Sequence, residues 1–125
     1  MARKRSKYGN KKVVFNGIKF DSVKEAERYK YLLMLKNAGI ITDLELQKEF
    51  VLIPSQREPD TIGKRGGKVK GKTIERKVSY IADFVYKRDG ELIVEDTKGV
   101  LTPDYVIKRK LLLFTHGIRI HEIRG

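Results

Sequence analysis

The feature that most constrains this chain is the pair Asp89-Gly90, which lies between two segments rich in apolar and β-branched residues, 78–87 and 91–97. An Asp-Gly pair between such segments favours a two-residue hairpin turn, because both of its residues tolerate the left-handed backbone that the turn requires. A turn of this kind fixes the register of the two strands. The register predicts that Asp83 lies directly opposite Asp96.

The consequence of this register is electrostatic. Directly opposed residues of an antiparallel pair have Cβ atoms about 5 Å apart, and two carboxylates so placed repel each other unless one is protonated or a cation lies between them. Side chains alternate along a strand, so Asp96 and Lys98 point the same way, and Asp83 shares its face with Ile81 and Val85. We therefore expect both acids and the lysine to meet at the edge of an apolar core.

Such a cluster suits a hard divalent cation, because Mg²⁺ prefers oxygen ligands and keeps several of its waters. A lysine beside the cation can orient an attacking water or stabilise charge that develops on a phosphate. Two unrelated surface acids at strand ends are the competing interpretation. An acid pair with a lysine on one apolar face favours a functional site.

Glu25 is a candidate for a third carboxylate at this site. It follows Ser22 by three residues, and at helical spacing it lies near the apolar stripe that contains Ala26 and Tyr29. Glu27 projects to nearly the opposite side of the same helix. The Ser22-x-x-Glu25 pattern is also that of a capping box, so the sequence leaves open whether Glu25 is a metal ligand or a helix cap.

The element order predicts an α/β domain with one central mixed sheet, flanked by helices and preceded by an N-terminal hairpin. Residues 1–12 are expected to form a basic, flexible arm, and residues 13–125 a single domain. The expected elements are a hairpin at 13–20, a helix at 22–38, a strand at 44–53, a basic glycine-rich loop at about 56–77, strands at 78–87 and 91–97, a helix at 102–115 and a strand at 118–123.

Charge indicates the class of partner. The chain has 28 Lys and Arg residues against 16 Asp and Glu residues, a net charge of +12. Such a field attracts polyanions, and nucleic acid is the first candidate, although ribosome-associated and membrane-surface proteins have similar charge. The chain has no cysteine, which excludes thiol catalysis and a disulfide framework and is compatible with the cytoplasm. No apolar run approaches membrane-spanning length, so we expect no membrane insertion.

The basic loop is the most cationic segment of the chain, with seven basic residues and one acid between Gly63 and Lys77. It can be a flexible loop or an extended basic hairpin, and we expect it to contact a nucleic-acid backbone or enter a groove. A linker without a binding role is the alternative. The expected nucleic-acid contacts are Lys64, Arg65, Lys68, Lys70, Lys72, Arg76 and Lys77, with Lys108 on the second helix.

Two segments carry a resemblance to a known group of enzymes. The segments Tyr80-Ile81-Ala82-Asp83-Phe84 and Val94-Glu95-Asp96-Thr97-Lys98-Gly99 resemble the PD-(D/E)xK nuclease superfamily, which includes restriction enzymes and archaeal Holliday junction resolvases. Ala82 stands where the superfamily motif has proline, a position that varies among members. The chain is most similar to short phage and prophage proteins assigned to this superfamily, over nearly its whole length.

This resemblance implies a restriction-endonuclease-like α-β-β-β-α-β core and a Mg²⁺-dependent, or Mn²⁺-dependent, endonuclease. It implies that Asp83 and Asp96 bind the metal, that the backbone carbonyl of Thr97 is a further ligand, that Glu25 assists, and that Lys98 positions the water. It also implies branched or structured DNA as substrate, without excluding RNA, together with a homodimer and the cytoplasm of a bacterial host.

Two other functions fit the composition. A catalytically inactive nucleic-acid-binding module could keep the same fold, but it has no need of the complete set of Asp83, Asp96 and Lys98. A basic adaptor could bind acidic proteins or anionic membrane, and salt-sensitive binding to DNA without such partners would count against it. The sequence therefore favours the nuclease.

Overall fold

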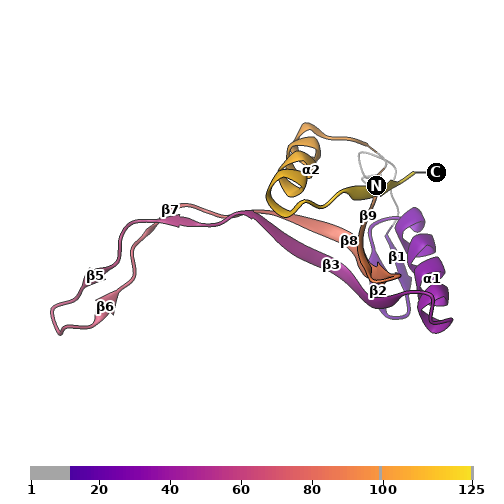
Figure 1. Ribbon diagram of the computed structural model, residues 1–125, viewed down its shortest axis with the longest axis horizontal. Coiled ribbons are helices and arrows are strands. Elements are labelled where there is room, and N and C mark those ends of the chain that lie inside the picture. The colour runs from indigo at the N-terminus through magenta and orange to yellow at the C-terminus, as the bar shows by residue number, and fades with distance from the viewer. Residues whose placement is uncertain (1–11, 99, 125) are drawn as a thin grey trace, which may run out of the picture.

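The computed structural model describes residues 12–98 and 100–124, and its centre is a four-stranded sheet (Figure 1). Residues 1–11 of the predicted N-terminal arm lie outside the described residues. The strand order is β10-β9-β8-β3, in which β3, β8 and β9 are antiparallel and β10 runs parallel to β9. The predicted mixed α/β class is confirmed. The strands are β3 (Thr42–Ile53), β8 (Val78–Arg88), β9 (Glu91–Thr97) and β10 (Ile120–Ile123), and the helices are α1 (Val23–Asn37) and α2 (Pro103–His116).

The N-terminal hairpin forms where Asn-Gly predicts it. Strands β1 (Val13–Phe15) and β2 (Ile18–Phe20) are joined by Asn16 and Gly17, whose φ angles of 55° and 74° are those of a tight hairpin turn. Phe20 is buried, and its ring centre lies 5.2 Å from that of Tyr29 on α1. The hairpin therefore packs against the first helix.

Helix α1 starts at the predicted cap, because the Ser22 side chain accepts a hydrogen bond of 3.1 Å from the backbone N–H of Glu25. Its buried face presents Ala26, Tyr29 and Leu32 to one end of the sheet. There Tyr29 stacks on Phe84 of β8, with ring centres 6.3 Å apart. This contact is part of the first of two core clusters.

Helix α2 starts at Thr102, whose side chain accepts from the backbone N–H of Tyr105, and it ends at Gly117 with a φ of 68°. Both ends match the prediction. Its buried residues, Tyr105 and Leu112, pack with Tyr80 and Val94 in the second core cluster. Neither helix in the described part of the chain has the length and apolar character needed to cross a bilayer.

The predicted register of β8 and β9 is confirmed from the turn onward. Asp89 and Gly90 have φ angles of 52° and 78°, and Val85 pairs with Val94. The regular pairing continues to Phe84 and Glu95 and stops there. Asp83 and Asp96, which were predicted to face each other, thus lie one position past the last regular pair of the two strands.

The predicted face of Asp83 needs correction. Val85 is 1% exposed, but Ile81 is 53% exposed, so they do not share one apolar face. Tyr80 and Ala82 pack in the α2 cluster, whereas Phe84 packs in the α1 cluster, although residues two apart in a regular strand point the same way. The alternation is therefore interrupted at Asp83, where β8 passes from one core cluster to the other.

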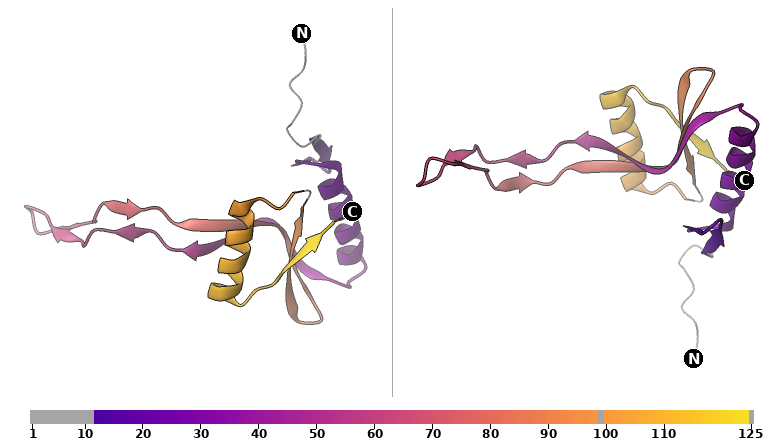
Figure 2. Two further views of the ribbon diagram at one scale, coloured as in Figure 1. Left: turned by 90° about the horizontal axis from the view of Figure 1, so that it is seen from above. Right: turned by 90° about the horizontal axis from the view of Figure 1, so that it is seen from below.

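Residues 56–77 form an extended hairpin rather than an irregular loop. Its paired segments are β4 (Gln56–Arg57) with β7 (Thr73–Glu75) and β5 (Thr61–Ile62) with β6 (Lys68–Val69). Figures 1 and 2 show this basic hairpin projecting from the sheet on the side opposite α1. Its strands approach closely at Gly71, where a Cβ would lie 1.8 Å from the Glu58 carbonyl oxygen, so only glycine is compatible with this crossing.

Candidate active site

Asp83 is held against the end of β9 by Thr97. One carboxylate oxygen of Asp83, Oδ2, accepts hydrogen bonds of 2.8 Å from both the backbone N–H and the hydroxyl of Thr97. These bonds replace the next step of the β8–β9 ladder. They place the Asp83 carboxylate beside the peptide bond that joins Asp96 to Thr97.

Asp96 is almost completely buried, with 2% of the residue exposed. The hydroxyl of Tyr80 donates a hydrogen bond to Asp96 Oδ2. Burial, and then the negative charge of Asp83, raise the pKa of Asp96 from 3.8 to about 6, against the opposing effects of Tyr80 and Lys98. The negative charge of Asp83 therefore disfavours the ionised form of Asp96.

Lys98 is the third residue of the predicted cluster with Asp83 and Asp96. Its Nζ lies 3.2 Å from Asp96 Oδ1 and 4.2 Å from the centre of the Tyr105 ring on α2. The side chain of Lys98 is 25% exposed, so the ammonium can meet a ligand from solvent. The salt bridge and the cation–π contact together restrict where the charge can lie.

Tyr105 of α2 links Lys98 to Glu122 of β10. Its hydroxyl donates to Glu122 Oε2 at 2.7 Å, and Arg109 Nη1 lies 2.9 Å from the same oxygen. The bond from Tyr105, aided by the neighbouring arginines, lowers the pKa of Glu122 to about 2. Glu122 therefore stays charged and accepts a hydrogen bond from the Tyr105 hydroxyl.

Glu25 lies at the first turn of α1 and is 7% exposed. Burial, and then the charges of Asp83 and Asp21, raise its pKa from 4.5 to about 7. Its backbone N–H is part of the helix cap. Its carboxylate, however, accepts a hydrogen bond of 3.3 Å from Gln47 Nε2 on β3. The Glu25 side chain therefore has a contact beyond the helix cap.

Gln47 on β3 connects the acid of α1 with the acid of β8. Its Nε2 lies 3.3 Å from Glu25 Oε1 and 3.4 Å from Asp83 Oδ1. Its φ of 52° is left-handed, which is costly for a residue other than glycine and is characteristic of functional sites. Gln47 stands in the ladder between the pairs of Leu46 and Lys48, at the point where the alternation of β8 breaks.

The donor chemistry of Glu25, Asp83 and Asp96 fits a hard divalent cation, because all three offer carboxylate oxygens and at least two of them have pKa values raised partly by neighbouring acids. The three carboxylates, however, do not lie as close together as the sequence predicts. Within residues 12–98 and 100–124, no three acid, histidine or cysteine side chains come together as a ligand set for one metal ion.

The sequence did not single out Tyr80 or Tyr105, which contact Asp96 and Lys98 directly. A signal for Tyr80 exists, since a tyrosine on the buried face of a strand needs a partner for its hydroxyl, and a buried acid supplies one. For Tyr105 the signal is absent, because its contact depends on how α2 is placed over the sheet.

The predicted nucleic-acid contacts lie on two elements, the basic hairpin and α2. Seven of them are exposed on the basic hairpin, and Lys108 lies on α2, 3.6 Å from Asp104. On the hairpin, Lys68 pairs with Asp60, and Lys77 pairs with Glu49 near its base. The hairpin thus presents charge at a distance from the acidic site, on a surface formed by Lys64, Arg65, Lys68, Lys70, Lys72, Arg76 and Lys77.

The fold and site define a mixed α/β protein with a carboxylate–lysine cluster at the end of its central strands. The chain belongs to the family described as protein of unknown function (DUF1064), whose model matches residues 5–123. No curated protein and no solved structure gave a significant match.

Proposed function

We propose that this chain is a metal-dependent nuclease that hydrolyses phosphodiester bonds in DNA, with Asp83, Asp96 and Lys98 at its catalytic centre. The observation that carries the proposal is the position of the Lys98 ammonium, 3.2 Å from Asp96 Oδ1. This carboxylate has a pKa raised to about 6 by burial and by Asp83. A lysine held beside mutually repelling acids is suited to phosphodiester hydrolysis.

In this proposal Asp83, Asp96 and Glu25 would bind Mg²⁺ or Mn²⁺, with the backbone carbonyl of Thr97 as a further ligand. The divalent ion, when bound, would act as a Lewis acid toward the phosphate and lower the pKa of a bound water. Lys98 would donate a hydrogen bond to the attacking water or to a phosphate oxygen as negative charge develops.

The neighbouring residues prepare the acids for this role. Thr97 fixes Asp83 Oδ2 through two hydrogen bonds of 2.8 Å. Burial and the bond to Asp96 raise the pKa of Tyr80 far above its ordinary value, so Tyr80 acts only as a donor to that carboxylate. The acids therefore keep their orientation before substrate arrives, which is the preorganisation that catalysis requires.

The order of elements supports the same class. The elements α1, β3, β8, β9, α2 and β10 follow one another in the order α-β-β-β-α-β that the resemblance to restriction-endonuclease-like cores implies. The sheet combines an antiparallel β3–β8–β9 unit with the parallel strand β10, and both proposed catalytic strands meet at the site.

The basic hairpin supports nucleic acid as the substrate. Its seven cations are exposed on a two-stranded projection, a shape that can follow a phosphate backbone or enter the major groove. We extend the proposal to a phage-type enzyme for branched or structured DNA, acting as a homodimer in the cytoplasm of a bacterial host. The symmetric cuts of a resolvase would require the dimer.

A second candidate is a catalytically inactive DNA-binding module. It is favoured by the absence of a three-ligand metal group among the residues that the structure describes, since the basic hairpin can bind without such a group. The two candidates differ in one outcome, which is whether the intact protein cuts DNA.

The test is digestion of four labelled DNA substrates, namely a four-way junction, a flap, a linear duplex and a single strand, each with Mg²⁺, with Mn²⁺ and with EDTA. The same digestions with RNA substrates show whether the protein prefers DNA or RNA. We expect metal-dependent cutting that is abolished by EDTA and strongest on the branched substrates. Binding without cutting of any DNA or RNA substrate in either metal would reject the nuclease in favour of the binding module.

A further inference from the structure

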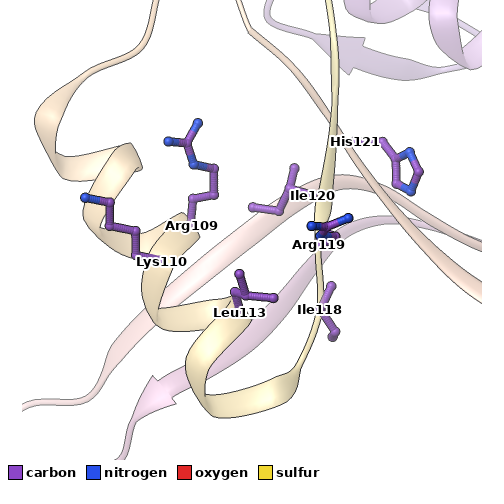
Figure 3. Close-up of a pocket in the computed structure, with 7 residues that line it drawn as sticks. All are labelled: Arg109, Lys110, Leu113, Ile118, Arg119, Ile120 and His121. Carbon is purple, nitrogen blue, oxygen red and sulfur yellow. The ribbon is translucent and has the colours of Figure 1, made fainter.

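A pocket of about 390 Å³ lies between α2 and the edge strand β10 (Figure 3). The helix contributes Arg109, Lys110 and Leu113. The strand and the residues before it contribute Ile118, Arg119, Ile120 and His121, with Arg119 projecting toward the viewer in Figure 3 and His121 on the side away from the helix. The lining thus combines aliphatic side chains with basic groups and contains no acid.

The cations of this pocket are available to a ligand. Lys110 and Arg119 are exposed, and neither forms a salt bridge within the part of the chain that the structure describes. Arg109 is committed to Glu122 at 2.9 Å. Strand β10 is at the edge of the sheet, so its outer backbone N–H groups have no strand partner among the described residues and can also donate to an anion.

The pocket adjoins the proposed catalytic centre through a continuous set of contacts. Arg109 binds Glu122, Glu122 binds Tyr105, and the Tyr105 ring lies 4.2 Å from Lys98 Nζ. In the sheet, Glu122 of β10 pairs with Asp96 of β9. Ile120, which lines the pocket, lies two residues before Glu122 on β10. Two residues of a strand advance about 7 Å, whereas DNA advances about 3.4 Å along its axis per nucleotide.

We infer that this pocket is a second phosphate-binding site, which holds the backbone of the same nucleic-acid strand one or two nucleotides from the phosphate beside Lys98. The inference rests on the proposed function. Arg119 and Lys110 bind the phosphate oxygens. The aliphatic residues Ile118, Ile120 and Leu113 lie against the adjoining sugar. The site positions the strand so that the scissile phosphate reaches the acids.

The basic hairpin does not fix the strand at the point of cutting, because it projects away from α1 and β9 (Figure 2), which carry Glu25 and Asp96. A separate cation site close to the centre therefore has a distinct role. The hairpin adds affinity along the DNA, and the pocket fixes the strand at the point of cutting. This difference makes the two surfaces separable by mutation.

The experiment measures binding of a short single-stranded DNA to full-length protein in EDTA, in an Asp96→Asn background that cannot cut. The double variant Lys110→Ala/Arg119→Ala is compared with a control, Lys36→Ala/Arg88→Ala, which removes two exposed cations outside the pocket and hairpin. We expect the pocket variant to bind at least about fivefold more weakly and to make the negative slope of log K against log salt shallower by about 1.4, or 0.7 for each lost contact. The control should leave the slope unchanged.

An equal change in both variants would overturn the inference, because it would show a loss of general charge only. An unchanged slope in the pocket variant would overturn it as well, and so would displacement of the DNA by a polyglutamate peptide at the same ionic strength with affinity above that of DNA. The result does not depend on cutting. Unchanged binding by the pocket variant together with cutting by wild type would reject the pocket alone, whereas weaker binding by the pocket variant without cutting by wild type would reject the nuclease and leave a phosphate contact at the pocket.

Discussion

Arg28 of α1 and Glu95 of β9 form a bidentate ion pair, with Nε 2.8 Å from Oε1 and Nη2 2.6 Å from Oε2. The Glu95 side chain is 1% exposed and that of Arg28 is 25% exposed. The hydroxyl of Tyr86 also donates to Glu95. Because Glu95 precedes Asp96, and Arg28 lies one turn after Glu25, this pair joins α1 and β9, two of the three elements that carry proposed metal ligands.

Breaking this pair should destabilise the protein. Arg28→Ala leaves the Glu95 carboxylate buried without its partner, and we expect the free energy of unfolding to fall by about 3 kcal/mol. The measurement is urea denaturation. The matched control is Lys30→Ala, which breaks an exposed pair of 3.1 Å with Glu27 on the same helix and should cost less than about 1 kcal/mol. Equal losses in the two variants would contradict a structural role for the buried pair.

The cation–π contact of Lys98 predicts a difference between two changes at Tyr105. Tyr105→Phe keeps the ring under the ammonium and loses only the bond to Glu122, so cleavage should fall little. Tyr105→Leu removes the ring, and a contact worth about 1 to 2 kcal/mol corresponds to a loss of about tenfold in kcat. The measurement is single-turnover cleavage by both variants. Equal rates for Phe and Leu would show that the ring does not position Lys98.

The raised pKa values of Glu25, about 7, and Asp96, about 6, predict a pH dependence of stability. Both carboxyls bind protons more tightly in the folded chain than in the unfolded chain. Their contribution to stability is therefore present at low pH and is lost as pH rises through about 6 to 7. Glu25→Gln should relieve this loss, so its unfolding free energy relative to wild type should rise by about 1 to 3 kcal/mol between pH 5 and pH 8.

The control for this measurement is Glu27→Gln on the same helix, where the side chain is 63% exposed. Its difference from wild type should not vary with pH over the same interval. A constant difference between Glu25→Gln and wild type would mean that Glu25 titrates normally, and that it is only part of the helix cap.

Binding of a divalent ion should stabilise the acidic site most where its carboxyls are charged. Above about pH 7, millimolar Mg²⁺ or Mn²⁺ should raise Tm of the wild type, since a ligand that binds only the folded state stabilises it by mass action. Glu25→Gln and Asp96→Asn should lose most of this shift, whereas Asp104→Asn, at an exposed acid on α2, should keep it. The measurement is thermal unfolding with metal against EDTA, and an equal shift in all variants would assign the ion to another site.

The basic hairpin should contribute affinity without contributing to the core. Lys64→Ala/Arg65→Ala/Lys68→Ala removes three exposed cations near its tip and should make the negative slope of log K against log salt for duplex DNA shallower by up to about 3. Lys19→Ala/Lys36→Ala/Arg88→Ala removes three exposed cations from the body of the domain. Tm should be unchanged in both, and a larger slope change in the body variant would place the DNA elsewhere.

The elements that depend on local chemistry were predictable from the sequence. The Asn16-Gly17 and Asp89-Gly90 turns, and the start of α2 at Thr102, all follow from preferences of one to four adjacent residues. The turn at Asp89 and Gly90 also gave the register that places Val85 opposite Val94. The boundaries of these elements differ from the prediction by only a few residues.

The site was predictable only in part, because its details depend on contacts between distant segments. Period-two alternation predicts a regular face for Asp83, but the left-handed Gln47 lies opposite the point where the alternation fails. The same interruption turns Asp83 toward Gln47 and Thr97. No sequence pattern within β8 alone predicts this interruption of the alternation. It arises where β3 and β8 pass from one core cluster to the other.

Cleavage of a labelled four-way junction in Mg²⁺ tests whether this protein is a nuclease. Wild type, Asp96→Asn, Lys98→Ala and the control Asp104→Asn are compared, with binding measured alongside. We predict that Asp96→Asn and Lys98→Ala bind the junction like wild type but cut it at least about a hundredfold more slowly, while Asp104→Asn cuts normally. Cutting by either site variant at the wild-type rate, or no cutting by wild type, would contradict the account.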